Sequence, residues 1–192
     1  MTLLYLRHGQ TDWNVQGRIQ GRTDVPLNET GREQARMRAA ELPEHQPPVE
    51  IIYASPMLRA RETAEIIQSA LGVPLRFDDR LVELCCGSLE GIERTKLIGG
   101  GIVSHFKAIG EAEVLRLGAE PFSALYRRVG GFLDEISAAH EGQCVLVVAH
   151  GGVGRMVQLY FHGQDESDPA KHGNAVLRRY SGGVPGGKGR FD

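Results

Sequence analysis

Two arginines and two histidines stand at points in the chain where chemistry could take place. Arg7 and His8 directly follow a short apolar run near the start of the chain. His150 follows a second such run, and Arg59 comes just after a third. Arginine offers a planar fork of donors that matches phosphate oxygens, and histidine can act as nucleophile, acid or donor near neutral pH. These residue types predict a phosphoryl site, to which a helix beginning at Gly151 would add backbone N–H groups and a positive dipole end.

The apolar runs that precede these residues are predicted to be strands. Residues 2–6, 49–54 and 144–149 are apolar and end abruptly at polar positions, which is typical of buried strands. A shorter strand is predicted at 73–77, and an edge strand at 175–180. Each of the three longer runs therefore leads into a loop where functional side chains can lie.

Helices are predicted between these strands. Residues 28–42 have an apolar face, and Thr30 and Glu33 match a capping box. Residues 56–71 have another, and Ser55 followed by proline predicts the N-cap of that helix. Two further helices, with apolar residues at steps of three and four, are predicted to begin at Pro121 and after His150.

Strands that alternate with helices predict a three-layer α/β/α sandwich with a mostly parallel sheet. In such sheets, ligands bind beyond the carboxyl ends of the strands. Arg7, His8 and His150 all follow predicted strands, and Arg59 lies on the first turn of the helix after the second strand. We therefore expect these four side chains to meet in one crevice, although the sequence separates Arg7 from His150 by 143 positions.

The chain is predicted to form a single domain over residues 1–180. Glycines at 87, 91 and 99–101 interrupt any long period, which predicts an irregular insert around 92–118. Residues 181–192 are rich in glycine and are predicted to be a flexible tail.

Composition limits the classes of protein that this chain can belong to. Its 22 Lys and Arg against 24 Asp and Glu give a formal net charge of −2. Nucleic-acid binders and proteins of anionic membrane surfaces need a concentrated excess of positive charge, so neither partner is expected. Because the net charge is close to zero, any anion site must be formed by a local group of positive side chains.

The longest uninterrupted apolar run, residues 145–149, is too short to span a bilayer.

Features of the termini and cysteines favour a cytoplasmic location. The N-terminus has neither a positively charged n-region nor a small-residue cleavage site. The cysteines, Cys85, Cys86 and Cys144, are odd in number and lack the spacing of a zinc site or a disulfide framework. Cys85 and Cys86 are interpreted either as small core residues or as oxidation-sensitive thiols.

Six sequence blocks, in order, resemble the histidine phosphatase superfamily, the phosphoglycerate mutase-like proteins. The resemblance covers residues 1–91 and about 118–180. A single Arg-His-Gly triplet is weak support, whereas six ordered blocks are specific. The blocks are LRHGQTDWN at 6–14, RIQGRTDVPL at 18–27, SPMLRA at 55–60, RLVE at 80–83, GSLEG at 87–91 and VVAHGG at 147–152.

The resemblance implies the roles of a nucleophile and an acid. His8 would attack phosphorus and form a phosphohistidine, for which its ring must be neutral. Arg7 and Arg59 would lower the pKa of His8, and a bound phosphate dianion would raise it, so the sequence leaves the direction open. Glu83 would protonate the leaving oxygen and then activate water, with Glu120 as the alternative acid. This chemistry requires no metal or other cofactor.

The resemblance also implies which residues bind the phosphoryl group. Arg7, Asn14, Arg59 and His150, with the N–H of Gly151, would hold its oxygens and stabilise their charge in the transition state. Gln20 and Gly21 are expected either to contact substrate or to form a turn.

Other phosphate chemistries lack their motifs. No cysteine is followed by arginine at the spacing of a cysteine phosphatase, and no Asp-x-Asp follows a strand. The glycine-rich run at 182–188 imitates a P-loop, but Gly189 stands where Ser or Thr is needed and too few residues remain for a helix.

The predicted function is hydrolysis of a small phosphorylated metabolite. One alternative is phosphotransfer of the phosphoglycerate mutase type, but mutases resembling this chain have arginine after the acid, where this chain has Leu84. The other alternative is a non-catalytic module that binds phosphorylated ligands. A binding pocket has no need of a leaving-group acid, so Glu83 favours an enzyme. The sequence gives no indication of an oligomer.

Overall fold

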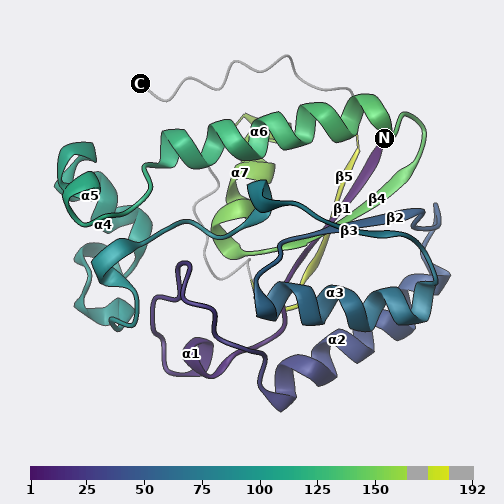
Figure 1. Ribbon diagram of the computed structural model, residues 1–192, viewed down its shortest axis with the longest axis horizontal. Helices are drawn as coiled ribbons and strands as arrows, with labels where there is room; N and C mark the ends of the chain where they lie inside the picture. The colour runs from purple at the N-terminus through teal and green to yellow at the C-terminus, as the bar shows by residue number, and fades with distance from the viewer. Residues whose placement is uncertain (164–172, 182–192) are drawn as a thin grey trace.

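The computed structural model describes residues 1–163 and 173–181, and a five-stranded sheet forms its centre (Figure 1). The strand order is β3-β2-β4-β1-β5. The strands are β1 (Thr2–Arg7), β2 (Ile51–Ala54), β3 (Leu75–Phe77), β4 (Cys144–Ala149) and β5 (Leu177–Ser181).

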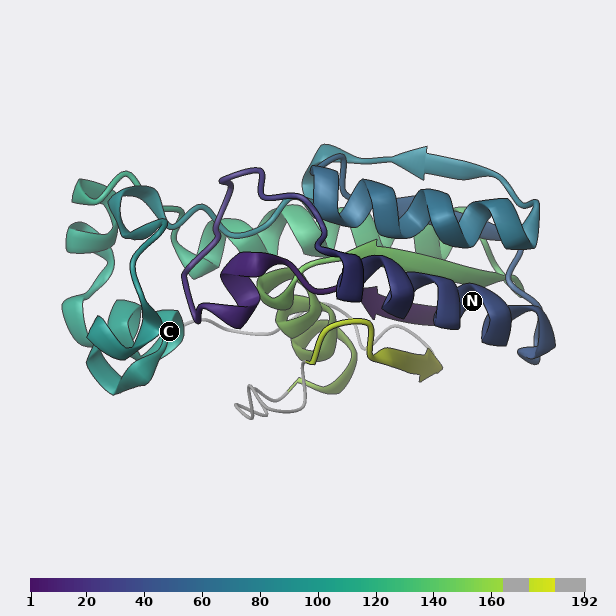
Figure 2. The same cartoon turned by 90° about the horizontal axis from the view of Figure 1, so that it is seen from below.

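The sheet is parallel except at one edge. Strands β1, β2, β3 and β4 pair in parallel, and β5 runs antiparallel to β1. Figure 2 shows the arrow of β5 pointing opposite to those of β1 and β4. The mostly parallel sheet predicted from the sequence is therefore confirmed.

Helices cover both faces of the sheet, as the predicted three layers require. In Figure 1, α2 and α3 lie below the sheet, and α6 and α7 lie above it. The helix bounds are α1 (Asp12–Val15), α2 (Glu29–Glu41), α3 (Leu58–Leu71), α4 (Ile102–Ile109), α5 (Glu111–Arg116), α6 (Phe122–Ala139) and α7 (Gly151–His162).

The core has two parts, one on each face of the sheet. Because successive strand residues point to opposite faces, Leu3 and Tyr5 of β1 pack into the α6 side, and Leu4 and Leu6 pack into the α2 side. Helix α6 contributes its predicted apolar face to the first part. Its buried residues are Leu125, Val129, Phe132, Leu133 and Ile136.

The start of α2 differs from the sequence prediction. Its N-cap is Asn28, whose side chain accepts from the N–H of Gly31, so the capping box predicted at Thr30 and Glu33 is wrong. Asparagine is as good an N-cap as threonine, and the chain enters the helix two residues earlier.

The start of α3 also differs from the sequence prediction. The helix begins at Leu58, with Met57 as N-cap and no side-chain cap, so the N-cap predicted at Ser55 is wrong. The hydroxyl of Ser55 instead contacts His150 and accepts a long bond from the N–H of Met57. A polar side chain that binds another segment is not available to cap a helix.

The insert predicted to be irregular contains two short helices, α4 and α5. Glycines mark the ends of α4, with Gly101 as its N-cap and Gly110 as its C-cap, rather than interrupting it. Between them Phe106 is buried, and its ring packs against Phe122 at 5.6 Å between centroids. Figures 1 and 2 both show α4 and α5 beyond the ends of β1 and β4, beside α1.

The tail predicted at 181–192 starts one residue too early, because Ser181 is the last residue of β5 and pairs with Thr2. Residues 182–192 lie outside the described residues, as do 164–172. Within the described part of the chain, no helix combines the length and apolar character needed to cross a membrane.

Candidate active site

The two histidines come together because β1 and β4 are neighbours. Arg7 lies opposite Ala149 in the ladder, and the N–H of His8 donates to the carbonyl of Ala149 at 2.9 Å. His8 and His150 therefore leave the sheet side by side. Their ring centroids are 5.3 Å apart, and the ring planes are inclined by 57°.

The His8 ring is held with one nitrogen committed. Its Nδ1 lies 2.7 Å from the carbonyl oxygen of Gly9. Because a carbonyl oxygen only accepts, Nδ1 must carry the proton, and in a neutral ring the lone pair is then on Nε2. Burial, followed by the charges of Arg7 and Arg59, lowers the pKa of His8 well below its usual range. The sequence leaves open whether the pKa of His8 is raised or lowered, and in the ligand-free protein it is lowered.

Arg59 is a fully buried cation on the first turn of α3. Its Nη1 donates to the carbonyl of Thr23 at 3.0 Å and its Nη2 to that of Gly21 at 2.8 Å. Its Nε is buried with no hydrogen-bond partner among the described residues. Burial lowers the pKa of Arg59, although the carboxylate of Glu83 acts against that shift. The guanidinium of Arg59 thus donates to neutral carbonyls and to no carboxylate among the described residues, so its positive charge is available to an anion that enters the site.

Arg7 adds a second guanidinium at the end of β1. Burial lowers its pKa to about 10, and the carboxylate of Glu83 opposes that shift. At neutral pH Arg7 therefore remains a cation, and together with Arg59 it gives the crevice a positive charge suited to phosphate.

His150 is buried and is held at both its ring and its backbone. Its Nε2 lies 2.8 Å from the hydroxyl of Ser55, and the hydroxyl of Tyr5 donates to its carbonyl. Its Nδ1 is buried and has no hydrogen-bond partner within the described part of the chain. Burial, with the charges of Arg59, His8 and Arg7, lowers the pKa of His150 well below its usual range. Both site histidines are consequently neutral before a ligand binds.

The side chain of Glu83 contacts the first turn of α7. One carboxylate oxygen accepts from the N–H of Leu84 at 2.8 Å, and both oxygens accept from the N–H of Gly152 at 3.1 and 3.2 Å. Its carboxylate is thus fixed beside the two residues that follow His150. The N–H of Gly152 is occupied by Glu83, whereas Gly151 lines the cavity beside Arg7.

Glu120, the alternative acid, has a different environment. It accepts from Arg128 at 2.8 and 2.9 Å and from Arg22 at 3.3 Å. Burial acts to raise the pKa of Glu120, but these arginines outweigh it and leave the pKa lowered. Arg22 and Arg128 also donate to the carbonyl of Glu83. Glu120 therefore anchors the segment that carries Glu83.

Asn14 is oriented by its neighbours. Its side-chain oxygen accepts from the backbone N–H of Thr11 at 3.1 Å and from the amide of Asn174 at 3.0 Å, and the hydroxyl of Thr11 lies 3.1 Å away. With the oxygen occupied on three sides, its NH₂ group is the part left to bind an anion. Thr11 and Asn14 also form the capping box of α1.

Gln20 and Gly21 both line the cavity, and Gly21 also forms a turn. Gly21 has a φ of +51°, and a Cβ there would lie 2.1 Å from Oε1 of Glu90. The Glu90 carboxylate accepts from the backbone of Arg22 and of Thr23 at 2.9 Å each. This loop supplies the carbonyls that hold Arg59, so its turn geometry serves the phosphate site.

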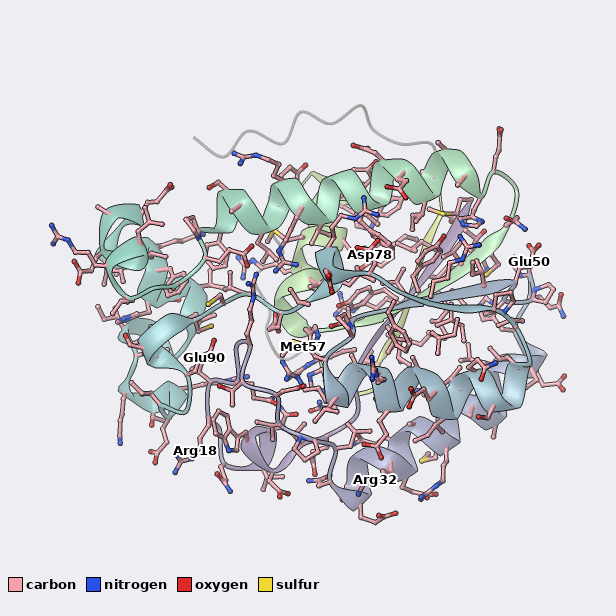
Figure 3. All side chains as sticks on the ribbon, in the orientation of Figure 1. Arg18, Arg32, Glu50, Met57, Asp78 and Glu90 are labelled. Carbon is pink, nitrogen blue, oxygen red and sulfur yellow. The ribbon has the colours of Figure 1, made fainter. Side chains whose placement is uncertain are left out.

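Seven of the sequence-predicted residues line one cavity of about 370 Å³ beyond the carboxyl ends of the strands, whereas Asn14 and His150 are not among its lining residues. Figure 3 shows Met57 near the middle of the molecule and Glu90 farther toward α4 and α5, with Glu50 at the opposite end. The sequence-predicted residues among its lining are Arg7, His8, Gln20, Gly21, Arg59, Glu83 and Gly151.

Sequence reasoning missed three supporting residues, Tyr5, Ser55 and Asn174. Tyr5 and Ser55 hold His150 as described above. Asn174 donates to the carbonyls of His8 at 3.1 Å and Gly9 at 3.2 Å, in addition to Asn14. The only sequence signal for Asn174 is its position just before the predicted edge strand.

The fold and site define an α/β protein with a phosphoryl pocket built on two histidines. Comparison with known proteins agrees, because the profile of the histidine phosphatase superfamily (branch 1) matches residues 3–181. The chain belongs to this superfamily, as the six sequence blocks indicate. Members of the family act through a phosphohistidine, and this protein is a phosphatase of that kind.

Individual relatives support the same conclusion. The phosphatase PhoE of Bacillus subtilis is 37% identical over 149 residues, covering 76% of this chain and 69% of its own. Phosphoserine phosphatase 1 of Hydrogenobacter thermophilus is 33% identical over 150 residues, covering 77% and 70%. The structure of a mycobacterial glucosyl-3-phosphoglycerate phosphatase is similar with a TM-score of 0.74 and 27% identity, covering 95% of this chain and 91% of that one.

Proposed function

We propose that His8 is the nucleophile of this phosphatase and that Glu83 is its acid and base. The observation that carries the proposal is the contact between Nδ1 of His8 and the carbonyl of Gly9. It leaves Nε2 as the attacking atom of a ring whose pKa burial has lowered. We assign small phosphorylated metabolites to this chain as its class of substrate; one relative of this class is a phosphoserine phosphatase.

Four side chains are proposed to hold the phosphoryl oxygens. Arg7 and Arg59 supply positive charge, and Asn14 and His150 supply N–H donors. Nδ1 of His150 can donate because the Ser55 hydroxyl, by donating to Nε2, keeps the ring proton on Nδ1. Such preorganised donors stabilise the transition state of phosphoryl transfer, in which charge spreads over the oxygens. We also assign the N–H of Gly151 to this set.

In the first step, Nε2 of His8 forms a bond to phosphorus as the bond to the ester oxygen breaks. The electron pair passes to that oxygen, and protonated Glu83 gives it a proton, so that the alcohol leaves. The ring then carries a positive charge, which the Gly9 carbonyl stabilises through the Nδ1 proton.

In the second step, water attacks the phosphohistidine. The Glu83 carboxylate takes a proton from the water, and the Nε2–P bond breaks with its electron pair returning to His8. Inorganic phosphate leaves, and Glu83 is protonated again for the next cycle. The two backbone N–H groups that hold its carboxylate keep it in place for both steps.

Hydrolysis rather than phosphotransfer fits the residue after the acid. Leu84 is buried and lines the cavity, where the mutases that resemble this chain have an arginine. An apolar side chain gives no anchor to a second phosphate. With 3-phosphoglycerate as substrate we therefore expect free phosphate, and accumulation of 2-phosphoglycerate would support the mutase alternative.

The cysteines support a cytoplasmic location, which we also propose. Cys85, Cys86 and Cys144 are free thiols, as expected in a reducing compartment. Cys86 is buried, and burial raises the pKa of its thiol, which favours the core interpretation for this cysteine. Fractionation that finds the protein outside the cytoplasm would contradict the proposal.

The roles of His8 and Glu83 can be separated with Glu83→Gln and p-nitrophenyl phosphate. Because p-nitrophenolate leaves without a proton, the first step continues while the second loses its base. We expect one equivalent of p-nitrophenol in a burst, and one phosphoryl group on the peptide containing His8 by mass spectrometry after alkaline quench. His8→Ala should show neither, with activity reduced on the order of 10³-fold or more. A phosphoryl group on another residue would overturn the proposal.

A further inference from the structure

The cavity extends beyond the phosphoryl site, and its remaining walls are largely apolar. Its volume of about 370 Å³ lies in the range of pockets that hold drug-sized ligands, so it has room for more than a phosphate. The apolar lining comes from four parts of the chain. Its members are Ile19, Leu84, Cys86, Ile102, Val103 and Phe122.

Three of these residues are only partly buried in the ligand-free protein. Ile102 and Val103 lie on the first turn of α4, and Phe122 begins α6. The Phe122 ring packs against the buried Phe106, which fixes this wall in place. Apolar surface that lines a cavity and stays partly in contact with water is stabilised when an apolar ligand covers it.

Side-chain acceptors for the hydroxyl or amino groups of an alcohol are few in the described lining. Ser104 offers a hydroxyl, and the side-chain oxygen of Gln20 already accepts from Thr11 at 3.0 Å. Glu83 is the only carboxylate among the described lining residues, and backbone N–H groups hold it. A polyhydroxylated or amino-substituted alcohol would therefore leave its own hydroxyl or ammonium donors without side-chain acceptors, which weakens binding.

Two arginines also line the cavity and are compatible with an apolar group. They are Arg94 and Arg155. Guanidinium planes stack on aromatic rings, and the stems pack against apolar surface. A flat apolar ring is a group that both the arginines and the Phe122 wall can contact.

We propose that the alcohol part of the preferred substrate carries an apolar group of about the size of an aromatic ring, seated between α4 and the start of α6. This inference rests on the proposed function, because the same cavity contains His8, Arg59 and Glu83 at its phosphoryl end. The ring-bearing alcohol occupies the part of the cavity lined by Leu84, Val103 and Phe122.

The test uses phosphate esters of primary alcohols that differ in the group carried next to the ester carbon. We would measure kcat/KM for ethyl phosphate, 2-phenylethyl phosphate, glycerol 3-phosphate and phosphoserine by phosphate release. We expect 2-phenylethyl phosphate to exceed each of the other three by about 30-fold, as burial of one ring implies. Equal or higher values for glycerol 3-phosphate or phosphoserine would overturn the inference while leaving the proposed function intact.

A pair of matched variants locates the binding surface. Val103→Thr keeps the shape of a lining side chain and adds a hydroxyl, so the ratio of kcat/KM for 2-phenylethyl over ethyl phosphate should fall about fivefold. Ile98→Thr makes a similar change at an exposed position outside the described lining, and the ratio should stay unchanged. An unchanged ratio in Val103→Thr would overturn the inference. If no ester releases phosphate and no phosphohistidine forms, the proposed function itself fails.

Discussion

The side-chain amide of Asn174 donates to the side-chain oxygen of Asn14 at 3.0 Å, across 160 positions of sequence. The same amide lies 3.1 Å from the carbonyl of His8 and 3.2 Å from that of Gly9. One NH₂ group thus holds both the loop of the nucleophile and an amide assigned to the phosphate. The N–H of the next residue, Ala175, donates to the carbonyl of Arg7 at 3.1 Å. Residues 174 and 175 therefore both hold the loop that carries His8.

Two substitutions of Asn174 should differ in a way that reports this arrangement. Asn174→Ala removes the donors, and we expect kcat/KM to fall about 10-fold, the effect of losing a buried hydrogen bond. Asn174→Asp places a carboxylate against three oxygen acceptors, and the loss should be greater, together with weaker inhibition by vanadate. Steady-state kinetics and vanadate inhibition measure both effects. An aspartate variant as active as the alanine variant would show that the amide does not position Asn14.

The two buried histidines predict how stability depends on pH. In the folded protein, burial and then the neighbouring arginines lower the pKa values of His8 and His150. Below the ordinary histidine pKa of about 6.5, the unfolded chain therefore binds protons that the folded protein does not. The free energy of unfolding should decrease as the pH falls below that value, by up to about 1.4 kcal/mol per pH unit for each histidine.

Urea unfolding at pH 7.5, 6.5 and 5.5 measures this dependence. His8→Asn should lower the slope of unfolding free energy against pH, because one of the two proton-binding rings is gone. His162→Gln, which replaces an exposed histidine at the end of α7, is the matched control and should keep the parent slope. Parallel curves for His8→Asn and the parent protein would contradict the prediction.

Most of the fold can be predicted because its elements carry periodic apolar patterns. Strand β4 has the predicted bounds, and α6 begins one residue after the predicted proline. The helices of the insert are harder to predict, because α4 has only eight residues and its amphipathic pattern covers two turns. Helix caps also escape prediction where a polar side chain serves another segment, as Ser55 does for His150.

The residues of the candidate site likewise fall into those that the sequence can predict and those that it cannot. Arg7, His8 and His150 can be found from residue type at the ends of strands, because parallel strands bring those ends to one edge. Asn174 and Ser55 cannot, because each acts through a contact with a residue far away in the sequence, and an isolated asparagine or serine usually belongs to a turn or a cap. Only the folded chain shows which distant atoms they meet.

The contact between α7 and Glu83 allows the role of the acid to be tested without substituting Glu83 itself. A Cβ at Gly152 would lie 2.4 Å from Oε1 of Glu83, closer than real side chains approach, so Gly152→Ala must displace that carboxylate. Alanine otherwise favours a helix by about 1 kcal/mol, so the helix itself should persist. Gly131→Ala in α6, where a Cβ would meet nothing within 4 Å, is the matched control.

We expect Gly152→Ala to lower kcat for alkyl phosphates by about 100-fold, because the displaced carboxyl no longer protonates the leaving oxygen. The burst rate with p-nitrophenyl phosphate should fall much less, since p-nitrophenolate leaves without a proton. Gly131→Ala should leave both rates unchanged. Equal losses for both esters would instead place the effect of Gly152 in phosphate binding, because only a displaced acid distinguishes leaving groups by their need for a proton.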